Sequence, residues 1–172
     1  MKRTASERTL TVDFLDRPRA WRGRLISGEG PGTEVRAGSF LRKRHITLDL
    51  ELLESPAALA HIVTHELFHF VWRRLGNRAR RSWEDLLAKE LRQGTPGELG
   101  WSSESRKLRL TREDWLRRTR RWREYACESF CDTAAWLYCR GTNAGRGLLN
   151  REARRARRKW FFSCRELKRC SV

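Results

Sequence analysis

The chain lacks any hydrophobic run that approaches the roughly 18 residues of a membrane span. Residues 1–8 also lack the apolar stretch of a secretory signal, so we expect a cytoplasmic protein. There are five cysteines, an odd number, and none of them form a Cys-x-x-Cys pair. This argues against a disulfide framework or a cysteine-based zinc site and favours small, buried, reduced thiols at Cys127 and Cys131.

Lysine is also scarce. Only six of the 38 basic residues are lysine, the other 32 are arginine, and the net charge is +17. A field of this sign attracts nucleic acid, anionic membrane surfaces or acidic proteins. The basic residues form three clusters: Arg78, Arg80 and Arg81; Arg117, Arg118, Arg120, Arg121 and Arg123; and nine residues between 151 and 169. These clusters are compatible with a solvated charged surface or with a surface that binds phosphate backbones. In the second case the affinity for nucleic acid would depend steeply on salt concentration.

No internal repeat divides the 172 residues, which are enough for one domain that buries about two-thirds of its unfolded surface. We expect that domain to cover residues 1–145. Residues 146–172 would add a basic amphipathic helix, capped by Asn150, that packs on the domain or extends from it.

The most informative pattern is His65-Glu66-Leu67-Phe68-His69. Residues four apart lie on one face of a helix, so His65 and His69 can direct their imidazoles at one metal ion. Glu66 then lies within reach of a water bound to that metal. This His-Glu-x-x-His pattern is typical of zinc-dependent hydrolases, in which the glutamate is the general base.

The surrounding residues predict a helix. Ser55 is a candidate N-cap, Pro56 suits the first helical position, and Gly76 is a candidate stop. Apolar residues recur at helical spacing and predict a core-facing stripe: Leu59, Val63, Leu67, Phe70 and Val71. The motif residues lie largely off that stripe. His61 is interpreted as a rim or packing residue and His45, in a predicted strand, as structural.

A catalytic zinc usually has three protein ligands and one open position. The third ligand is sought downstream, where Glu124, Glu128 and Asp132 follow one another at four-residue spacing in a predicted helix. One carboxylate can bind the metal while another orients a ligating histidine through its second ring nitrogen.

A His-Glu-x-x-His motif followed by Glu128-Ser129-Phe130-Cys131-Asp132 resembles the gluzincin branch of the zincin metallopeptidases. The resemblance implies Zn²⁺ held by His65, His69 and Glu128, with Glu66 as catalytic base. It also implies that Asp132 lies behind a ligand, and Glu124 is the alternative ligand. The related metzincin pattern is excluded, because Trp72 and Leu75 occupy the positions of its glycine and third histidine.

Three strands are predicted, at Thr9–Leu15, Arg19–Ile26 and Phe40–Leu50. Further helices are predicted at Arg81–Arg92, ending near Gly94, and from the cap Thr111 to about Cys139, with Gly141 as stop. Residues 95–105 are predicted to be a loop that overhangs the site. The expected fold is α+β and zincin-like: a small, mostly antiparallel N-terminal sheet packed on the motif helix and on the long glutamate-bearing helix.

The expected function is zinc-dependent peptide hydrolysis. Glu66 would take a proton from metal-bound water and pass it to the leaving amine. Tyr125, Tyr138 or an arginine would stabilise the oxyanion, and an edge strand at 40–50 would receive an extended peptide. The alternative is a basic nucleic-acid-binding protein whose metal is structural or absent.

Overall fold

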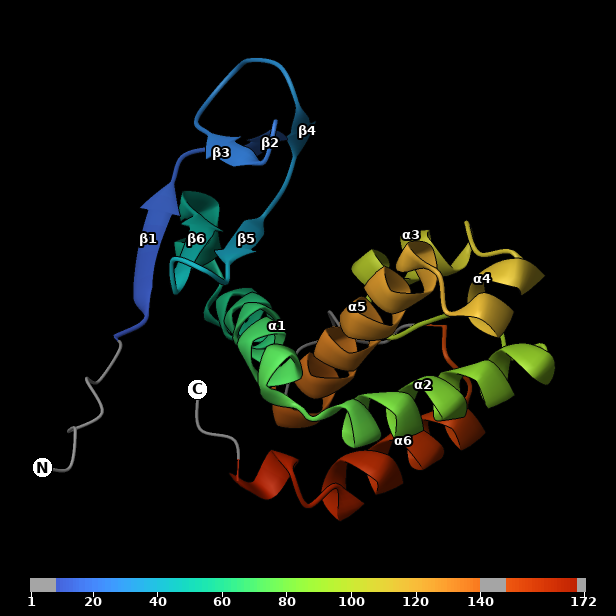
Figure 1. The fold of residues 1–172 in the computed structure, drawn as a ribbon. Coiled ribbons are helices and arrows are strands. Elements are labelled where there is room, and N and C mark those ends of the chain that lie inside the picture. Colours follow the sequence, from blue (N-terminus) through green and yellow to red (C-terminus); the bar gives the residue numbers. More distant parts are fainter. Residues whose placement is uncertain (1–8, 140–147, 170–172) are drawn as a thin grey trace, which may run out of the picture. The chain divides into compact units, whose positions relative to one another are not determined.

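The computed structural model describes residues 9–139 and 148–169. The chain divides into two compact units, Met1–Leu59 and Ala60–Val172. The first contains the strands, and the second contains nearly all of the helical residues (Figure 1). The chain is therefore α+β. The division lies at residue 59. The expected boundary at residue 145 lies outside the described residues. Within the described ranges, no helix is long and apolar enough to cross a membrane.

The first unit holds two small sheets in place of the single predicted one. Their strands are β1 (Thr11–Leu15), β2 (Arg19–Trp21), β3 (Arg24–Ile26), β4 (Thr33–Glu34), β5 (Ala37–Phe40) and β6 (His45–Asp49). One sheet has the order β1-β6-β5, in which β6 runs parallel to β1 and antiparallel to β5. The other has the order β3-β2-β4 and is wholly antiparallel. Pairing is thus mostly antiparallel, as predicted.

Two of the predicted strands are each divided by a turn. Arg22 and Gly23 both have positive φ, +47° and +74°, so the segment 19–26 forms a hairpin with the geometry of a type I′ turn. The segment 40–50 is divided as well, because β5 ends at Phe40, β6 begins at His45, and the turn between them includes Arg44, whose φ is +52°. Because β6 is the central strand of its sheet, the predicted edge strand at 40–50 is wrong. The edges of that sheet are β1 and β5.

The two sheets of the first unit touch where Leu25 of β3 meets Gly38 of β5. A Cβ atom at Gly38 would lie 3.1 Å from a methyl carbon of Leu25, so a glycine allows this close approach. After β6, a short 3-10 helix, η1 (Leu50–Glu54), leads to the first long helix.

The remaining elements are helical: α1 (Pro56–Arg74), α2 (Asn77–Arg92), α3 (Trp101–Lys107), α4 (Arg112–Arg117), α5 (Arg120–Tyr138), α6 (Arg151–Ser163) and the 3-10 helix η3 (Leu167–Arg169). The predicted caps are confirmed at Ser55, whose hydroxyl accepts from the Ala58 amide, and at Asn150, whose side chain accepts from the Ala153 amide. Gly76, the predicted stop, lies two residues beyond the end of α1 at Arg74 and is the N-cap of α2.

Helix α2 begins four residues earlier than predicted, at Asn77, and ends as predicted near Gly94. Gly94 has φ of +66°, its amide donates to Leu91, and the Thr95 amide donates to Glu90. These two bonds make a Schellman motif, which satisfies the last carbonyls of the helix.

The predicted helix from Thr111 to Cys139 is two helices, α4 and α5. Arg118 is left-handed, with φ of +49°, and Thr119 begins α5 as its N-cap. The Asp114 carboxylate accepts from the hydroxyls of Thr111 and Thr119, at 2.9 and 2.6 Å, and so binds the residues before and after α4. The predicted stop at Gly141 lies outside the described residues.

An aromatic cluster forms the core of the second unit. Phe130 of α5 stacks on Phe161 of α6 with ring centroids 4.9 Å apart, and Trp83 of α2 packs edge-on against both rings. The indole of Trp83 also donates to the Ala126 carbonyl. Helices α2 and α6 therefore lie side by side (Figure 1), and both pack against α5.

A buried ion network ties α6 into this unit. Arg157 is completely buried, and its guanidinium binds Glu90 and Glu98, each with a closest distance of 2.6 Å. Burial raises the pKa of Glu98, but Arg157 outweighs burial and lowers that pKa below its usual value. The basic C-terminal helix is consequently part of the core of the second unit, and Arg157 is not a surface charge.

We expect Arg157→Ala to lower the free energy of unfolding by about 3–5 kcal/mol, because the buried Glu90 loses its counter-charge and the buried Glu98 keeps only Lys107, 3.5 Å away. Urea denaturation followed by circular dichroism measures this. The matched control is Arg155→Ala, an exposed position on the same helix, which should change stability by no more than about 0.5 kcal/mol. Equal effects of the two changes would contradict a structural role for Arg157.

Candidate metal centre

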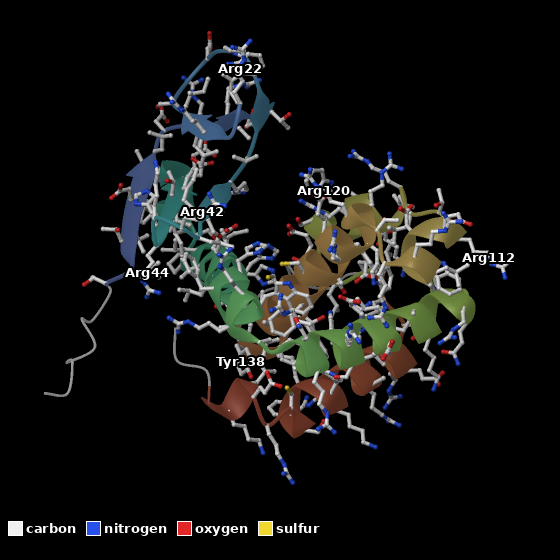
Figure 2. The ribbon with its side chains drawn as sticks, viewed as in Figure 1. Arg22, Arg42, Arg44, Arg112, Arg120 and Tyr138 are labelled. Atoms are coloured by element: carbon white, nitrogen blue, oxygen red, sulfur yellow. The ribbon has the colours of Figure 1, made fainter. Side chains whose placement is uncertain are left out.

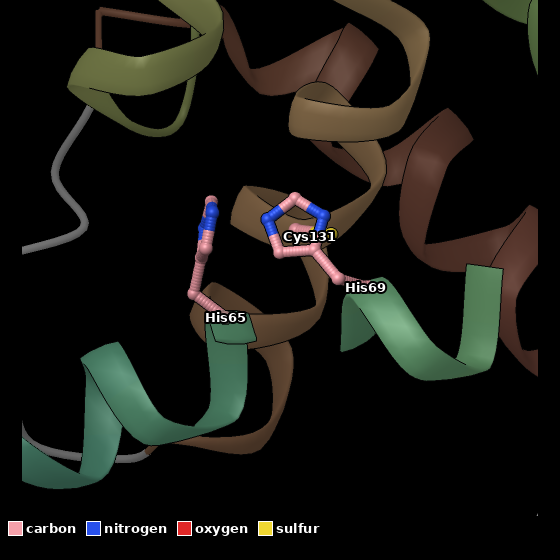
Figure 3. A group of neighbouring side chains, drawn as sticks. All are labelled: His65, His69 and Cys131. Carbon is pink, nitrogen blue, oxygen red and sulfur yellow. The ribbon is translucent and has the colours of Figure 1, made fainter. Parts of the chain in front are cut away.

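His65 and His69 project from neighbouring turns of α1. Their ring centroids are 5.0 Å apart, and His65 is buried. One possible ligand atom of each histidine and the Sγ atom of Cys131 all lie within 4.8 Å of one another, so this group can hold a metal ion. Figure 3 shows the two rings on α1, with Cys131 of α5 behind the ring of His69.

Glu128 of α5 also faces the two histidines. Its Oε2 lies 3.3 Å from Nε2 of His65 and 3.9 Å from Nε2 of His69. Ligand atoms about 2.0–2.1 Å from a tetrahedral zinc are about 3.3 Å from each other. These two separations therefore fit a metal ion bound between the carboxylate and the two rings.

Glu128 is ionised in this setting. Burial raises its pKa, but His65, His69 and Arg106 together bring the pKa of Glu128 down to about 2. The carboxylate does not have to lose a proton before it binds a cation at neutral pH.

Asp132 holds the other side of the His65 ring. Nδ1 of His65 donates to its Oδ1 at 2.8 Å, and this leaves Nε2 directed at Glu128. The other oxygen accepts from the amide and hydroxyl of Ser103, at 3.0 and 2.6 Å, in the first turn of α3. A Cβ at Gly100 would come within 2.5 Å of this carboxylate, so position 100 requires glycine.

Helix α3 supplies two further contacts that the sequence reasoning missed. The Ser102 hydroxyl donates to Oε2 of Glu128 at 2.6 Å, and Nη2 of Arg106 lies 3.1 Å from its Oε1. The predicted loop at 95–105 does reach the site, but it does so as a helix. No spacing in the sequence links Ser102 to Glu128, because only the packing of α3 on α5 brings them together.

Glu66, the predicted base, is buried, and its negative charge helps to raise the pKa of both His65 and His69. Burial alone would lower these pKa values. For His65 the hydrogen bonds with Asp132 and Glu128 outweigh burial and raise the pKa well above its usual value. Three carboxylates thus surround two imidazoles, and their negative charge favours a bound cation.

Cys127 occupies the position behind His69 that Asp132 occupies behind His65. Its Sγ lies 3.4 Å from Nδ1 of His69. A hydrogen bond from Cys131 lowers the pKa of Cys127 to about 6, with a further contribution from His69 and against the effect of burial. Burial raises the pKa of the Cys131 thiol itself. The sequence predicted buried thiols here, but their contact with a histidine was missed, because a separation of 58 residues carries no signal.

Three predicted site residues lie in other surroundings. Glu124, the alternative ligand, forms a partly exposed ion pair with Arg120 at 2.7 Å. The Tyr125 hydroxyl is completely buried and donates to Glu98, so it is committed to the Arg157 network and is no longer an oxyanion candidate. Tyr138 is half exposed and stacks on Phe68, with ring centroids 5.5 Å apart.

The other histidines fit their predicted roles. His61 is buried, and burial lowers its pKa, so it stays neutral beside the cluster. His45 of β6 contacts Asp13 at 3.4 Å and the Thr47 hydroxyl at 3.0 Å, within the sheet.

We expect Asp132→Ala to weaken zinc binding about 10–100-fold, because His65 would lose the group that orients its ring. Competition with a chromogenic chelator measures this affinity. Ser103→Ala removes a hydroxyl from the same carboxylate but leaves the His65 contact, so it should bind zinc more tightly than Asp132→Ala. Wild-type affinity in Asp132→Ala would show that this carboxylate only caps α3.

Comparison with known proteins returned no match. No protein-family model, no curated protein and no solved structure resembles the chain significantly. The function therefore has to be inferred from the geometry of these side chains.

Proposed function

We propose that the chain is a zinc-dependent peptidase. The observation that carries the proposal is the position of Oε2 of Glu128, 3.3 and 3.9 Å from Nε2 of the two motif histidines. His65, His69 and Glu128 would be the three protein ligands. Asp132 supports this set from behind, because it holds Nδ1 of His65 and leaves Nε2 for the metal.

Glu128 is favoured over Cys131 as the third ligand. Glu128 is already ionised, whereas the Cys131 thiol is fully buried with a raised pKa and would have to lose its proton to bind. Three protein ligands also leave the open position that catalysis needs. If Cys131 joined the other three residues, a four-ligand site would be closed and structural.

In such a site the bound zinc would polarise the scissile carbonyl and lower the pKa of a water molecule. Glu66 is the one carboxylate within the His65–His69 motif, and its charge acts on both histidines. Its carboxylate would accept the proton of the attacking water and deliver it to the leaving amine.

Arg106 is the best candidate for stabilising negative charge on the substrate. Its guanidinium contacts Oε1 of Glu128 and the hydroxyl and carbonyl of Ser102, and its side chain is 37% exposed. Arg106 therefore contacts the proposed carboxylate ligand and is also accessible to a substrate that enters from solvent. Ser102 and Arg106 together hold both oxygens of Glu128 in place.

The third ligand can be identified by substitution. We expect Glu128→Ala to lose stoichiometric zinc, because one of three ligands is removed, whereas Cys131→Ala should keep both zinc and hydrolysis. Metal content after gel filtration measures this, and His65→Ala is the positive control for loss. Zinc retained in Glu128→Ala and lost in Cys131→Ala would assign the site to the thiol and contradict the proposed ligand set.

The general base can be tested separately. Glu66→Gln keeps the shape of the side chain but cannot accept a proton, so we expect it to bind zinc like the wild type and to lose peptide hydrolysis by at least about 100-fold. Digestion of a peptide library, read by mass spectrometry, measures activity on many peptide sequences at once. Full activity in this variant would eliminate Glu66 as the base.

A further inference from the structure

Several members of the three basic clusters are engaged in contacts within the second unit. Arg157 is buried, Arg118 binds both Glu84 and Asp85 at 2.6 and 2.7 Å, and Arg80 donates to the Leu75 carbonyl. Arg117 and Arg120 pair with carboxylates one turn away. These residues stabilise the helices. Other cluster members, among them Arg155 and Lys159, stay exposed, so a selective partner needs a place that offers more than positive charge alone.

The first unit provides such a place. An open groove of about 920 Å³ lies between its elements, lined by residues from β1, β5, β6 and the β2–β3 hairpin. Its exposed lining residues include the aromatic Phe14 and the basic Arg22, Arg24 and Lys43, together with Asp13 and Gly23. Arg22 lies at the tip of the hairpin, as Figure 2 shows.

The charge of the groove is positive and largely uncompensated. Within residues 9–139 and 148–169, no carboxylate forms an ion pair with Arg22, Arg24 or Lys43. Asp13 is the one acidic residue among those that line the groove, and it contacts His45. The groove therefore favours an anionic ligand.

Aromatic rings accompany the positive charge. Phe14 of β1, which lines the groove, is 40% exposed, and so is Trp21, which neighbours Arg22 but is not among the lining residues. The Arg22 guanidinium lies 5.1 Å from the centre of the Trp21 ring, and the Lys43 ammonium lies 6.0 Å from that of Phe40. A groove that combines cations with exposed rings can bind phosphates and stack bases at the same time.

We propose that this groove binds single-stranded nucleic acid. The chemistry favours a single strand over a duplex, because duplex bases are stacked on one another and cannot stack on Phe14. It favours nucleic acid over an acidic peptide, because arginine and lysine beside flat rings match a chain of phosphates and bases. The activity is separate from the metal centre, since every lining residue belongs to the first unit.

The hairpin offers a variant that removes charge without harming the fold. Arg22→Asn converts the turn to Asn-Gly, which is the preferred sequence of a type I′ turn. Arg24→Thr places a residue that favours strands at an exposed strand position. We expect the double variant Arg22→Asn/Arg24→Thr to lower the slope of log affinity against log salt concentration by about 1.4, as for two lost phosphate contacts on a single strand.

The experiment is a fluorescence-anisotropy titration of the full chain with labelled oligothymidylate over a series of salt concentrations. Phe14→Ala should weaken binding at least about fivefold with an unchanged salt slope, because it removes stacking and leaves the charge. The matched control is Arg155→Gln/Lys159→Gln, which removes two exposed charges from α6 and should bind like the wild type. Glu66→Gln should also bind like the wild type.

Three results would overturn the proposal. Oligothymidylate binding in Arg22→Asn/Arg24→Thr that matches the wild type would exclude the groove. Greater loss in the α6 control would assign binding to the C-terminal helix. A Phe14→Ala variant that binds oligothymidylate, duplex DNA and heparin like the wild type would reduce the groove to a general polyanion surface.

Discussion

The carboxylate of Asp132 is the contact on which the candidate site depends. It lies on α5, accepts the Nδ1 proton of His65 from α1, and accepts the amide and hydroxyl of Ser103 at the start of α3. One side chain thereby joins three helices and sets the direction in which His65 presents its free nitrogen. The glycine at position 100 belongs to the same constraint, because any side chain there would displace the carboxylate.

The second unit contains buried charge at two places, with different consequences. Around Arg157 two glutamates face two cations, the guanidinium and Lys107, and the network closes within the protein. Around His65 and His69 the carboxylates of Glu66, Glu128 and Asp132 raise the pKa values of the two imidazoles, and Arg106 contacts Glu128. The first network stabilises the fold, whereas the group at the two histidines could hold a metal ion.

The sequence predicted the local features that depend on neighbouring residues. The motif helix and the caps at Ser55, Thr111 and Asn150 follow from helical spacing and side-chain chemistry. The approach of Glu128 and Asp132 to the motif histidines is what the resemblance to the gluzincin pattern implied. The sequence missed the features that depend on distant contacts. The break at Arg118 depends on the position of α2, and the roles of Ser102, Arg106 and Cys127 depend on how α3 and α1 pack against α5. The edge-strand prediction was wrong because the alternation of apolar and polar residues indicates a strand but not the position of that strand in its sheet.

The burial of Arg157 has a consequence for biosynthesis. Its partner Glu98 precedes it by 59 residues, so a ribosome has to add most of the second unit before the counter-charge emerges. Until then Glu90 and Glu98 either stay exposed to water or take up a proton. The packing around Arg157 is therefore completed only after α6 has been synthesised and has left the exit tunnel.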